Sequence, residues 1–282
     1  MSEDSRIFDT PGVKFEMKFY PWSLAMALVS LFPFVAQATE IHCLDTGIAN
    51  VYLLKGKKSF LIDTSSHGHE KEIEAWLQKQ GTPLKSLEAI ILTHGHGDHA
   101  GGAMELGKKQ GVPVWVGAQD HGMLKQGKSR PLLATSFIAG LLGIFVDSPY
   151  PAYTADREIS SAVDLAPYGI NGQIIPLPGH TQGSLALILN DSHSAIVGDL
   201  IRGGVFQTEE PRLHFFHEAR PQTQWQLWQL LKHQKIQTFY PGHFGPLNRE
   251  AIEKSFFPTG LFNWLMPITE GERQGFPSYS NL

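Results

Sequence analysis

The sequence predicts an α/β protein in which two mixed β-sheets are covered by helices on their outer faces. From residue 39 onward, short apolar runs alternate with segments of helical periodicity. The same alternation occurs in both halves of the chain, without a sequence repeat. A chain of 282 residues with 42% hydrophobic content can bury one large core. We therefore expect a single domain over residues 39–282.

The first half opens with three short strands joined by tight turns at glycines. A helix follows, because Ile73, Trp76 and Leu77 have helical spacing and Gly81 provides a C-terminal cap. A buried strand then leads directly into a cluster of histidines. The expected strands are 41–47, 50–56, 59–64, 87–94 and 112–117, and the expected helices are 69–81, 100–111 and 118–127.

The second half repeats this alternation in kind. One long helix is expected over 222–234, with Trp225, Trp228 and Leu231 facing inward, and a short helix should follow His243. The expected strands are 172–180, 184–191, 194–201 and 238–243.

The amino terminus has the pattern of an export signal. From Met17 the chain has one lysine, an apolar run to Val35 and the small-x-small sequence Ala36-Gln37-Ala38. We expect Met17 to be the true start, residues 1–38 to be an extension plus signal peptide, and cleavage to follow Ala38. The protein would then be periplasmic or secreted. An uncleaved membrane anchor is the alternative.

Composition limits the possible partners and the possible kinds of metal site. The net charge of -4 and the isoelectric point near 6.3 show no basic footprint, so we expect a small-molecule substrate and no nucleic acid. The single cysteine, Cys43, excludes an internal disulfide and any thiolate-rich zinc site. Any metal must therefore be held by the 13 histidines and by carboxylates.

The stretch "THGHGDHAGG" contains four candidate ligands on a loop that leaves the strand 87–94. Two of them, His94 and His96, can turn towards one ion, while Asp98 and His99 can reach a second point nearby. Three further candidates each follow an apolar run and adjoin a glycine, as expected of loops at strand ends: His180, Asp199 and His243.

This combination of "THGHGDHAGG", "PGH", "GD" and "PGH" resembles the metallo-β-lactamase superfamily over roughly residues 40–250. The resemblance implies an αββα sandwich. It also implies that His94, His96 and His180 hold a first metal, that Asp98, His99 and His243 hold a second, and that Asp199 bridges the two. Asp63 in "LIDT" matches a position whose residue orients a metal-binding side chain without binding the metal itself. Its alternative role is that of a turn residue at a strand end.

The ligand set suggests a hydrolytic mechanism. Two adjacent divalent ions share a water, lower its pKa and hold a bridging hydroxide as the nucleophile. Asp98 would orient this hydroxide and act as the catalytic carboxylate. Nitrogen and oxygen ligands without sulfur favour Zn²⁺, with manganese and iron as alternatives.

Asp199 separates this chain from true β-lactamases, which resemble it but lack the bridging aspartate. The resemblance is closer to the branch that includes glyoxalase II and lactonases. We therefore expect an exported dinuclear hydrolase that cleaves an ester-like, lactone or thioester bond of a small hydrophobic substrate. The alternatives are a mononuclear-iron sulfur dioxygenase and a β-lactamase-like amide hydrolase.

An apolar insertion is expected over about 122–172, with its most apolar part at 132–146. Three roles are open for it: a lid over the site, a helix packed on the core or on a twin subunit, or a contact with a membrane surface. Three residues near the ligands are possible substrate contacts, with a structural role as the alternative: Arg202, His214 and His217. The sequence predicts no oligomeric state.

Overall fold

The computed structural model describes residues 39–135, 137, 139–140 and 149–257. The expected export signal lies outside the described residues, and so does most of the apolar run 132–146. Within the described part, no helix is both long and apolar enough to cross a bilayer.

The first sheet has six strands in the order β1-β2-β3-β4-β5-β6. The first three are antiparallel neighbours, whereas β4, β5 and β6 each run parallel to the preceding strand. Their bounds are β1 Glu40–Asp45, β2 Asn50–Lys55, β3 Ser59–Ile62, β4 Ala89–Ile91, β5 Val114–Gly117 and β6 Arg157–Ile159.

The second sheet also has six strands, in the order β12-β11-β10-β9-β8-β7. Only the β10–β11 pair is parallel. Their bounds are β7 Val163–Asp164, β8 Gly172–Pro176, β9 Leu185–Leu189, β10 Ser194–Gly198, β11 Thr238–Pro241 and β12 Leu247–Asn248.

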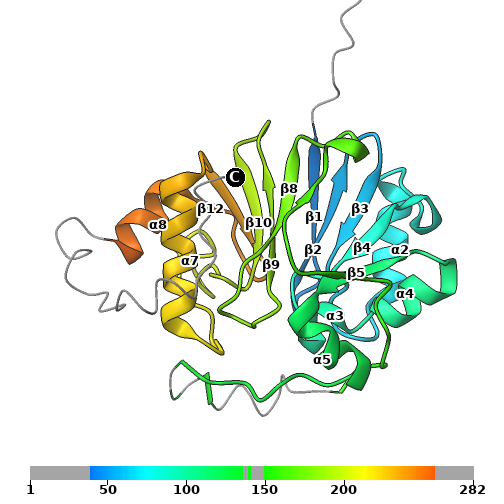
Figure 1. The fold of residues 1–282 in the computed structure, drawn as a ribbon, viewed down its shortest axis with the longest axis horizontal. Helices are drawn as coiled ribbons and strands as arrows, with labels where there is room; N and C mark the ends of the chain where they lie inside the picture. The colour runs from blue at the N-terminus through cyan, green and yellow to red at the C-terminus, as the bar shows by residue number, and fades with distance from the viewer. Residues whose placement is uncertain (1–38, 136, 138, 141–148, 258–282) are drawn as a thin grey trace, which may run out of the picture. The chain divides into compact units, whose positions relative to one another are not determined.

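Helices cover the outer face of each sheet, as Figure 1 shows. The bounds of those on the first sheet are α2 Glu70–Lys79, α4 Ala103–Gln110 and α5 His121–Gln126. Those on the second are α7 Arg220–His233 and α8 Arg249–Phe256. Short helices occupy η2 Leu84–Ser86, α3 Gly97–Ala100, η3 Ala118–Asp120 and η4 Ala166–Tyr168.

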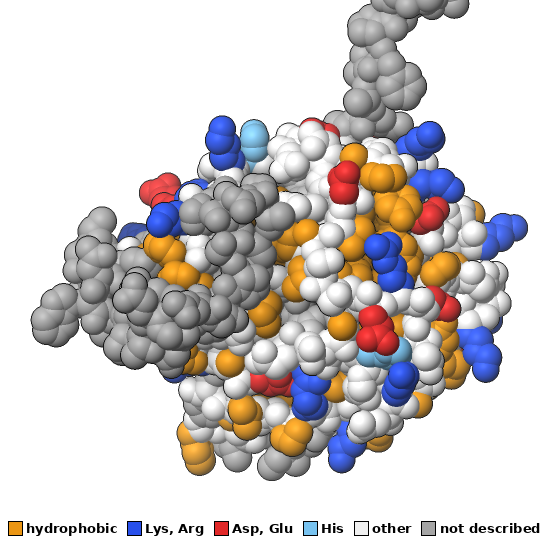
Figure 2. Space-filling view, viewed as in Figure 1, with side chains coloured by type: hydrophobic (Ala, Val, Ile, Leu, Met, Phe, Trp, Pro, Cys, Tyr) orange, Lys and Arg blue, Asp and Glu red, His pale blue; other side chains and the backbone are white. Residues whose placement is uncertain are grey.

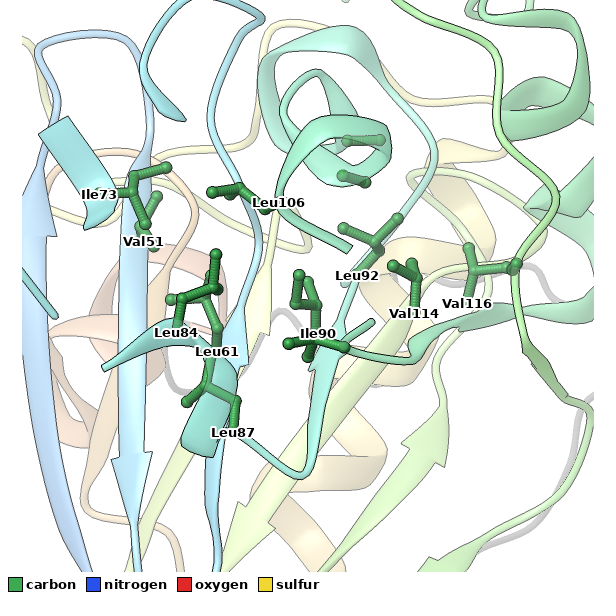
Figure 3. Close-up of a cluster of buried hydrophobic side chains, with 14 of the residues drawn as sticks. Val51, Leu61, Ile73, Leu84, Leu87, Ile90, Leu92, Leu106, Val114 and Val116 are labelled. Atoms are coloured by element: carbon green, nitrogen blue, oxygen red, sulfur yellow. The ribbon is translucent and has the colours of Figure 1, made fainter. Parts of the chain in front are cut away.

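Three buried apolar clusters hold these four layers together. One joins α2 and α4 to the first sheet and includes Ile73, Leu106 and Ile90 (Figure 3). A second joins α7 and α8 to the other sheet, and a third lies between the sheets, where residues such as Phe60 meet Leu187. The expected two mixed sheets flanked by helices are confirmed.

The structure corrects several local expectations. On α7, Leu227 and Leu230 are buried together with Leu231, whereas Trp225 and Trp228 are half-buried. The two indole rings pack on each other with centroids 4.9 Å apart, on the flank of the helix. The inward face was therefore predicted wrongly, because the leucines and not the larger indoles fit against the sheet.

Two other segments contain more regular secondary structure than expected. Asp98 and His99 belong to the one-turn helix α3, not to an irregular loop. The expected insertion 122–172 also contributes to the fold, because β6 pairs with β5 and β7 pairs with β8. These pairings place β6 and β7 at the edges of the two sheets.

The strand directions explain where the histidines and aspartates meet. His94 follows β4 in the first sheet, while Asp199 and His243 follow the parallel strands β10 and β11 in the second. These three ends meet at one edge of the sandwich, the lower edge in Figure 1, beside α3 and α5. Both sheets therefore contribute to a single site.

Candidate metal centre

Three histidines form a compact nitrogen cluster, here called subsite A. His180 Nε2 lies 3.2 Å from His94 Nε2 and 3.0 Å from His96 Nδ1. The three rings are almost fully buried. Nitrogen ligands of one tetrahedral zinc ion lie about 3.3 Å apart, given metal–nitrogen bonds of about 2.0–2.1 Å. The spacing of subsite A therefore suits one shared ion.

A second group, subsite B, lies beside it and contains Asp98, His99 and His243. His243 Nε2 is 3.2 Å from His99 Nε2 and 3.4 Å from Asp98 Oδ2. Two of its side chains are more accessible than those of subsite A, since Asp98 is 19% exposed and His243 14% exposed, whereas His99 is fully buried. Subsite B is therefore the side from which a solute can approach.

Asp199 joins the two subsites. Its Oδ2 atom lies 3.5 Å from His180 Nε2 in subsite A and 3.4 Å from His243 Nε2 in subsite B. Both carboxylate oxygens are buried, and neither accepts a hydrogen bond in good geometry from the described residues. A buried carboxylate without donors is costly unless a cation neutralises it. This orphaned carboxylate, surrounded by imidazole nitrogens, fits a bound metal.

Hydrogen bonds on the far side of three rings orient them towards the centre. His180 Nδ1 donates to the carbonyl oxygen of Phe216, and His243 Nδ1 donates to that of Ile48, both at 2.8 Å. The Nδ1 atom of His94 lies 3.1 Å from Thr93 Oγ1. In the neutral ring of His180 the Nδ1 proton leaves Nε2 with a free lone pair, as a metal ligand requires.

Asp63 lies behind His99, as the sequence suggested. Its Oδ2 is 2.9 Å from His99 Nδ1, and it also accepts hydrogen bonds from the Thr93 amide and hydroxyl, both at 2.7 Å. Asp63 thus ties the strand end at Thr93 to the imidazole of subsite B. Its backbone φ of 63° fits the alternative role in a turn as well, so the residue serves both.

Close packing explains one of the glycines beside the candidate ligands. A Cβ atom on Gly242 would lie 2.2 Å from Asp199 Oδ1 and 2.6 Å from His99 Cε1. Only glycine lets the backbone before His243 pass this close to the centre. The glycine of this "PGH" motif is therefore a requirement of the site.

Sequence reasoning missed Asp120, which is fully buried and connects the two loops of subsite A. It accepts hydrogen bonds from the Gly95 amide at 3.0 Å and from the Gly183 amide at 2.9 Å. Thr181 Oγ1 and an Arg130 nitrogen donate to it as well, both at 2.6 Å. Gly95 lies between two ligand histidines and Thr181 follows the third. Since η3 looks like an ordinary polar turn in sequence, no motif marks this residue.

The two subsites differ in their electrostatics. In subsite A, burial holds the pKa of His94 and of His180 well below the ordinary value, so these rings are neutral. In subsite B, burial acts to lower the pKa of His243, but Asp199 and Asp98 together outweigh burial and raise that pKa to about 9. The pKa of Asp98 is held below its usual range, because His99 and His243 outweigh the effect of burial.

The three possible substrate contacts are placed differently. His214 belongs to the centre, since its Nε2 lies 3.2 Å from Asp199 Oδ2 and its ring stacks on His243. His217 is buried behind His180, with its Nδ1 3.1 Å from Thr223 Oγ1. Arg202 lies over the ring of Phe215, 3.8 Å from its centroid.

Comparison with known proteins supports the family resemblance seen in the sequence. A family model of the metallo-beta-lactamase superfamily matches residues 44–243. The chain is 36% identical over 142 residues to hydroxyacylglutathione hydrolase GloC of Haemophilus influenzae. That match covers 50% of this chain and 63% of the relative, which is less than two thirds of its length.

Solved structures agree on the fold. The B3 metallo-beta-lactamase BLEG-1 superposes with a TM-score of 0.57 at 18% identity, covering 79% of this chain and 100% of that one. A di-iron-bound protein, TTHA1623, gives 0.54 at 21% identity, covering 76% and 97%. The fold and its clusters of histidine and aspartate imply divalent metal ions. The chain thus belongs to the metallo-β-lactamase superfamily and is a metallo-hydrolase.

Proposed function

We propose that this chain is a dinuclear hydrolase that cleaves an ester-like, lactone or thioester bond of a small hydrophobic substrate. The observation that carries this proposal is the position of Asp199. Its buried carboxylate lies between two groups of imidazoles, within 3.5 Å of nitrogens from both. A carboxylate so placed suits a bridge between two cations better than a ligand of one.

The residues divide the work as follows. His94, His96 and His180 would hold one ion, Asp98, His99 and His243 the other, and Asp199 both. Such a pair of ions supplies Lewis acidity and an activated water when bound. Asp98 is the most accessible carboxylate of the centre, so we assign it the role of orienting the water and receiving its proton.

The bond type is inferred from the presence of Asp199 and from one relative. The Haemophilus influenzae protein is named as a hydrolase of a thioester-type substrate, hydroxyacylglutathione. The described helix after β12 is α8 alone, and residues 258–282 lie outside the described part. Because of that relative's named substrate, we propose the thioester as one member of the substrate class, together with lactones and esters. We propose no nucleic acid as substrate.

We propose zinc as the metal, because the centre offers nitrogen and oxygen atoms without sulfur. The first experiment is metal analysis of protein purified without chelator or added metal. Two equivalents per chain are expected, followed by turnover of thioesters, lactones and esters in a substrate screen. His42→Gln is a matched control, since this histidine lies on β1 and belongs to none of the candidate metal-binding groups of the described residues. It should leave the metal content unchanged.

One equivalent of iron together with oxidation of a small thiol compound would replace this proposal with the dioxygenase. Turnover of β-lactams alone would replace it with the amide hydrolase. Absence of metal, even after dialysis against zinc, manganese or iron, would reject the dinuclear function.

Export is proposed separately, from the sequence "MKFYPWSLAMALVSLFPFVAQATE" at residues 17–40. Amino-terminal sequencing of the protein from the periplasm or the medium tests it. A terminus at Thr39 is expected, and a terminus upstream of the apolar run would favour the membrane anchor.

A further inference from the structure

Five large hydrophobic side chains are exposed among the described residues, four of them on loops and Phe137 in a helical segment. They are here called the apolar rim: Ile48, Leu133, Phe137, Val205 and Phe206. Scattered exposed hydrophobics are normal on a protein surface and need no explanation. Their concentration on three segments that are distant in sequence does need one.

Contacts with the residues of the centre place these loops. The carbonyl oxygen of Ile48 accepts from His243 Nδ1, and the amide of Gly203, just before Val205, donates to the carbonyl of His243 at 3.1 Å. The carbonyl of Leu133 accepts from the His217 amide at 3.1 Å. The rim therefore surrounds the same edge of the sandwich from which subsite B is open.

The degree of exposure shows what kind of contact the rim can make. Phe206 is 99% exposed and Phe137 is 83% exposed. A side chain that lines a substrate pocket is partly covered by the pocket's other walls, and these two rings are not. Apolar area of this kind becomes buried only against a surface outside the protein. Figure 2 shows hydrophobic side chains along the lower edge of the molecule, beside Lys and Arg side chains.

The charged residues near the apolar rim indicate which kind of surface the rim can contact. Residues 121–146 contain three cations, Lys125, Lys128 and Arg130, and no Asp or Glu. The side chains of Lys125 and Lys128 are exposed. On the loop of Val205 and Phe206, Glu210 pairs with Arg212, and the exposed Glu209 adds one negative charge. Exposed aromatic rings together with exposed lysines are typical of segments that lie at the interface of an anionic membrane.

We propose that the apolar rim docks this protein on a bilayer containing anionic phospholipid, with the opening of the metal centre facing the lipid surface. The aromatic rings enter the boundary between headgroups and acyl chains, and Lys125 and Lys128 contact phosphate groups. An amphiphile with an acyl chain would then reach the centre directly from the membrane. This last consequence rests on the proposed function, whereas the docking itself does not require metal or turnover.

The test is sedimentation of the full chain with vesicles of phosphatidylcholine, with and without 30% phosphatidylglycerol. We expect binding to the anionic vesicles, and a double variant, Phe137→Ser with Phe206→Ser, should weaken it at least about ten-fold. Lys128→Gln should weaken it about five-fold. Parent and variants share residues 1–38, so the difference between them reports on the rim. Phe206→Leu should retain binding.

Two controls keep the result specific. Lys71→Gln removes an exposed charge from α2, on the outer face of the first sheet, and should leave vesicle binding unchanged. The double variant should keep the metal content of the parent and its turnover of a short water-soluble ester. Loss of either would mean that the substitutions damaged the centre, and Phe206→Ser alone would then be compared.

Several results would overturn the proposal. These are absence of parent binding to anionic vesicles, equal binding by parent and double variant, or an equal loss with Lys71→Gln. A rim-dependent dimer in gel filtration, with no vesicle binding, would assign the surface to a second copy instead. Failure of the proposed function would be seen separately, as vesicle binding without any hydrolysis.

Discussion

Subsites A and B differ in the way the chain supports them, although they share Asp199. Subsite A has three neutral, buried imidazoles on two loops that Asp120 connects. Subsite B has a carboxylate, greater exposure and imidazoles whose pKa values are raised when metal is absent. An ion entering B must displace protons, whereas an ion entering A meets free lone pairs. We infer that A is a preformed, tight site and that B is the exchangeable site where substrate is handled.

The largest effect is expected from Asp199→Asn, because this residue belongs to both subsites. An amide NH₂ would face imidazole nitrogens and remove a negative charge between the ions. We expect turnover to fall at least about 10³-fold, equivalent to roughly 4 kcal/mol of barrier, and metal content to fall to one equivalent or less. Asp191→Asn, on an exposed turn, is the matched control. Two retained equivalents with normal turnover would refute the bridging role.

Asp98→Asn should separate the two subsites. The change leaves subsite A intact, so one equivalent of metal should remain and the protein should stay folded. Turnover should fall about 10²-fold or more, because a carboxylate that moves protons typically contributes that much. Steady-state kinetics and metal analysis of the same sample measure both. Activity within a few-fold of the parent would show that Asp98 is not the catalytic carboxylate.

Asp120→Asn should affect subsite A selectively. Asp120 accepts from four donors, and an amide can accept on one side only, so one backbone amide would face another N–H group. Supporting groups of this kind change metal affinity by about 10–100-fold. Competition with a chelator should show weaker binding of the tighter ion and unchanged binding of the other. Asp156→Asn, whose carboxylate accepts from the Val114 amide and the Tyr153 hydroxyl, is the control and should leave the chelator competition unchanged.

The smallest expected effect concerns His217 and the stability of the metal-free protein. Burial lowers the pKa of His217 to about 4, from an ordinary value of 6.5. The unfolded chain then binds a proton below pH 6.5 that the folded chain does not bind until about pH 4, so stability falls as the pH falls through this window. The slope from this group is about 1 kcal/mol per pH unit.

Urea unfolding of the metal-free protein at several pH values between 4 and 7 measures this slope. His217→Gln should reduce this slope. It should also lower the stability at pH 7.5, since the contact with Thr223 is altered. An unchanged slope would show that His217 does not titrate in this range.

The sequence by itself determined the alternation of strands and helices and the seven candidate ligands of the centre. Residues such as His94, Asp98 and Asp199 were identifiable because each follows an apolar strand or adjoins a glycine, and these signals are local. The family resemblance also predicted that these seven residues meet at one site. Some element boundaries and the inward face of α7 were not predictable, because packing against the sheet selects leucine over tryptophan there.

Only the tertiary structure decided which residues support the ligands. Asp120 comes from a turn 26 residues after His94 and connects loops that are more than 80 residues apart in the chain. His214 stacks on His243 from a different loop. The apolar rim likewise consists of residues from three separate segments of the chain. Such arrangements depend on how two sheets pack against each other, and hydrogen-bonding partners brought together in this way leave no periodic or local pattern in a single sequence.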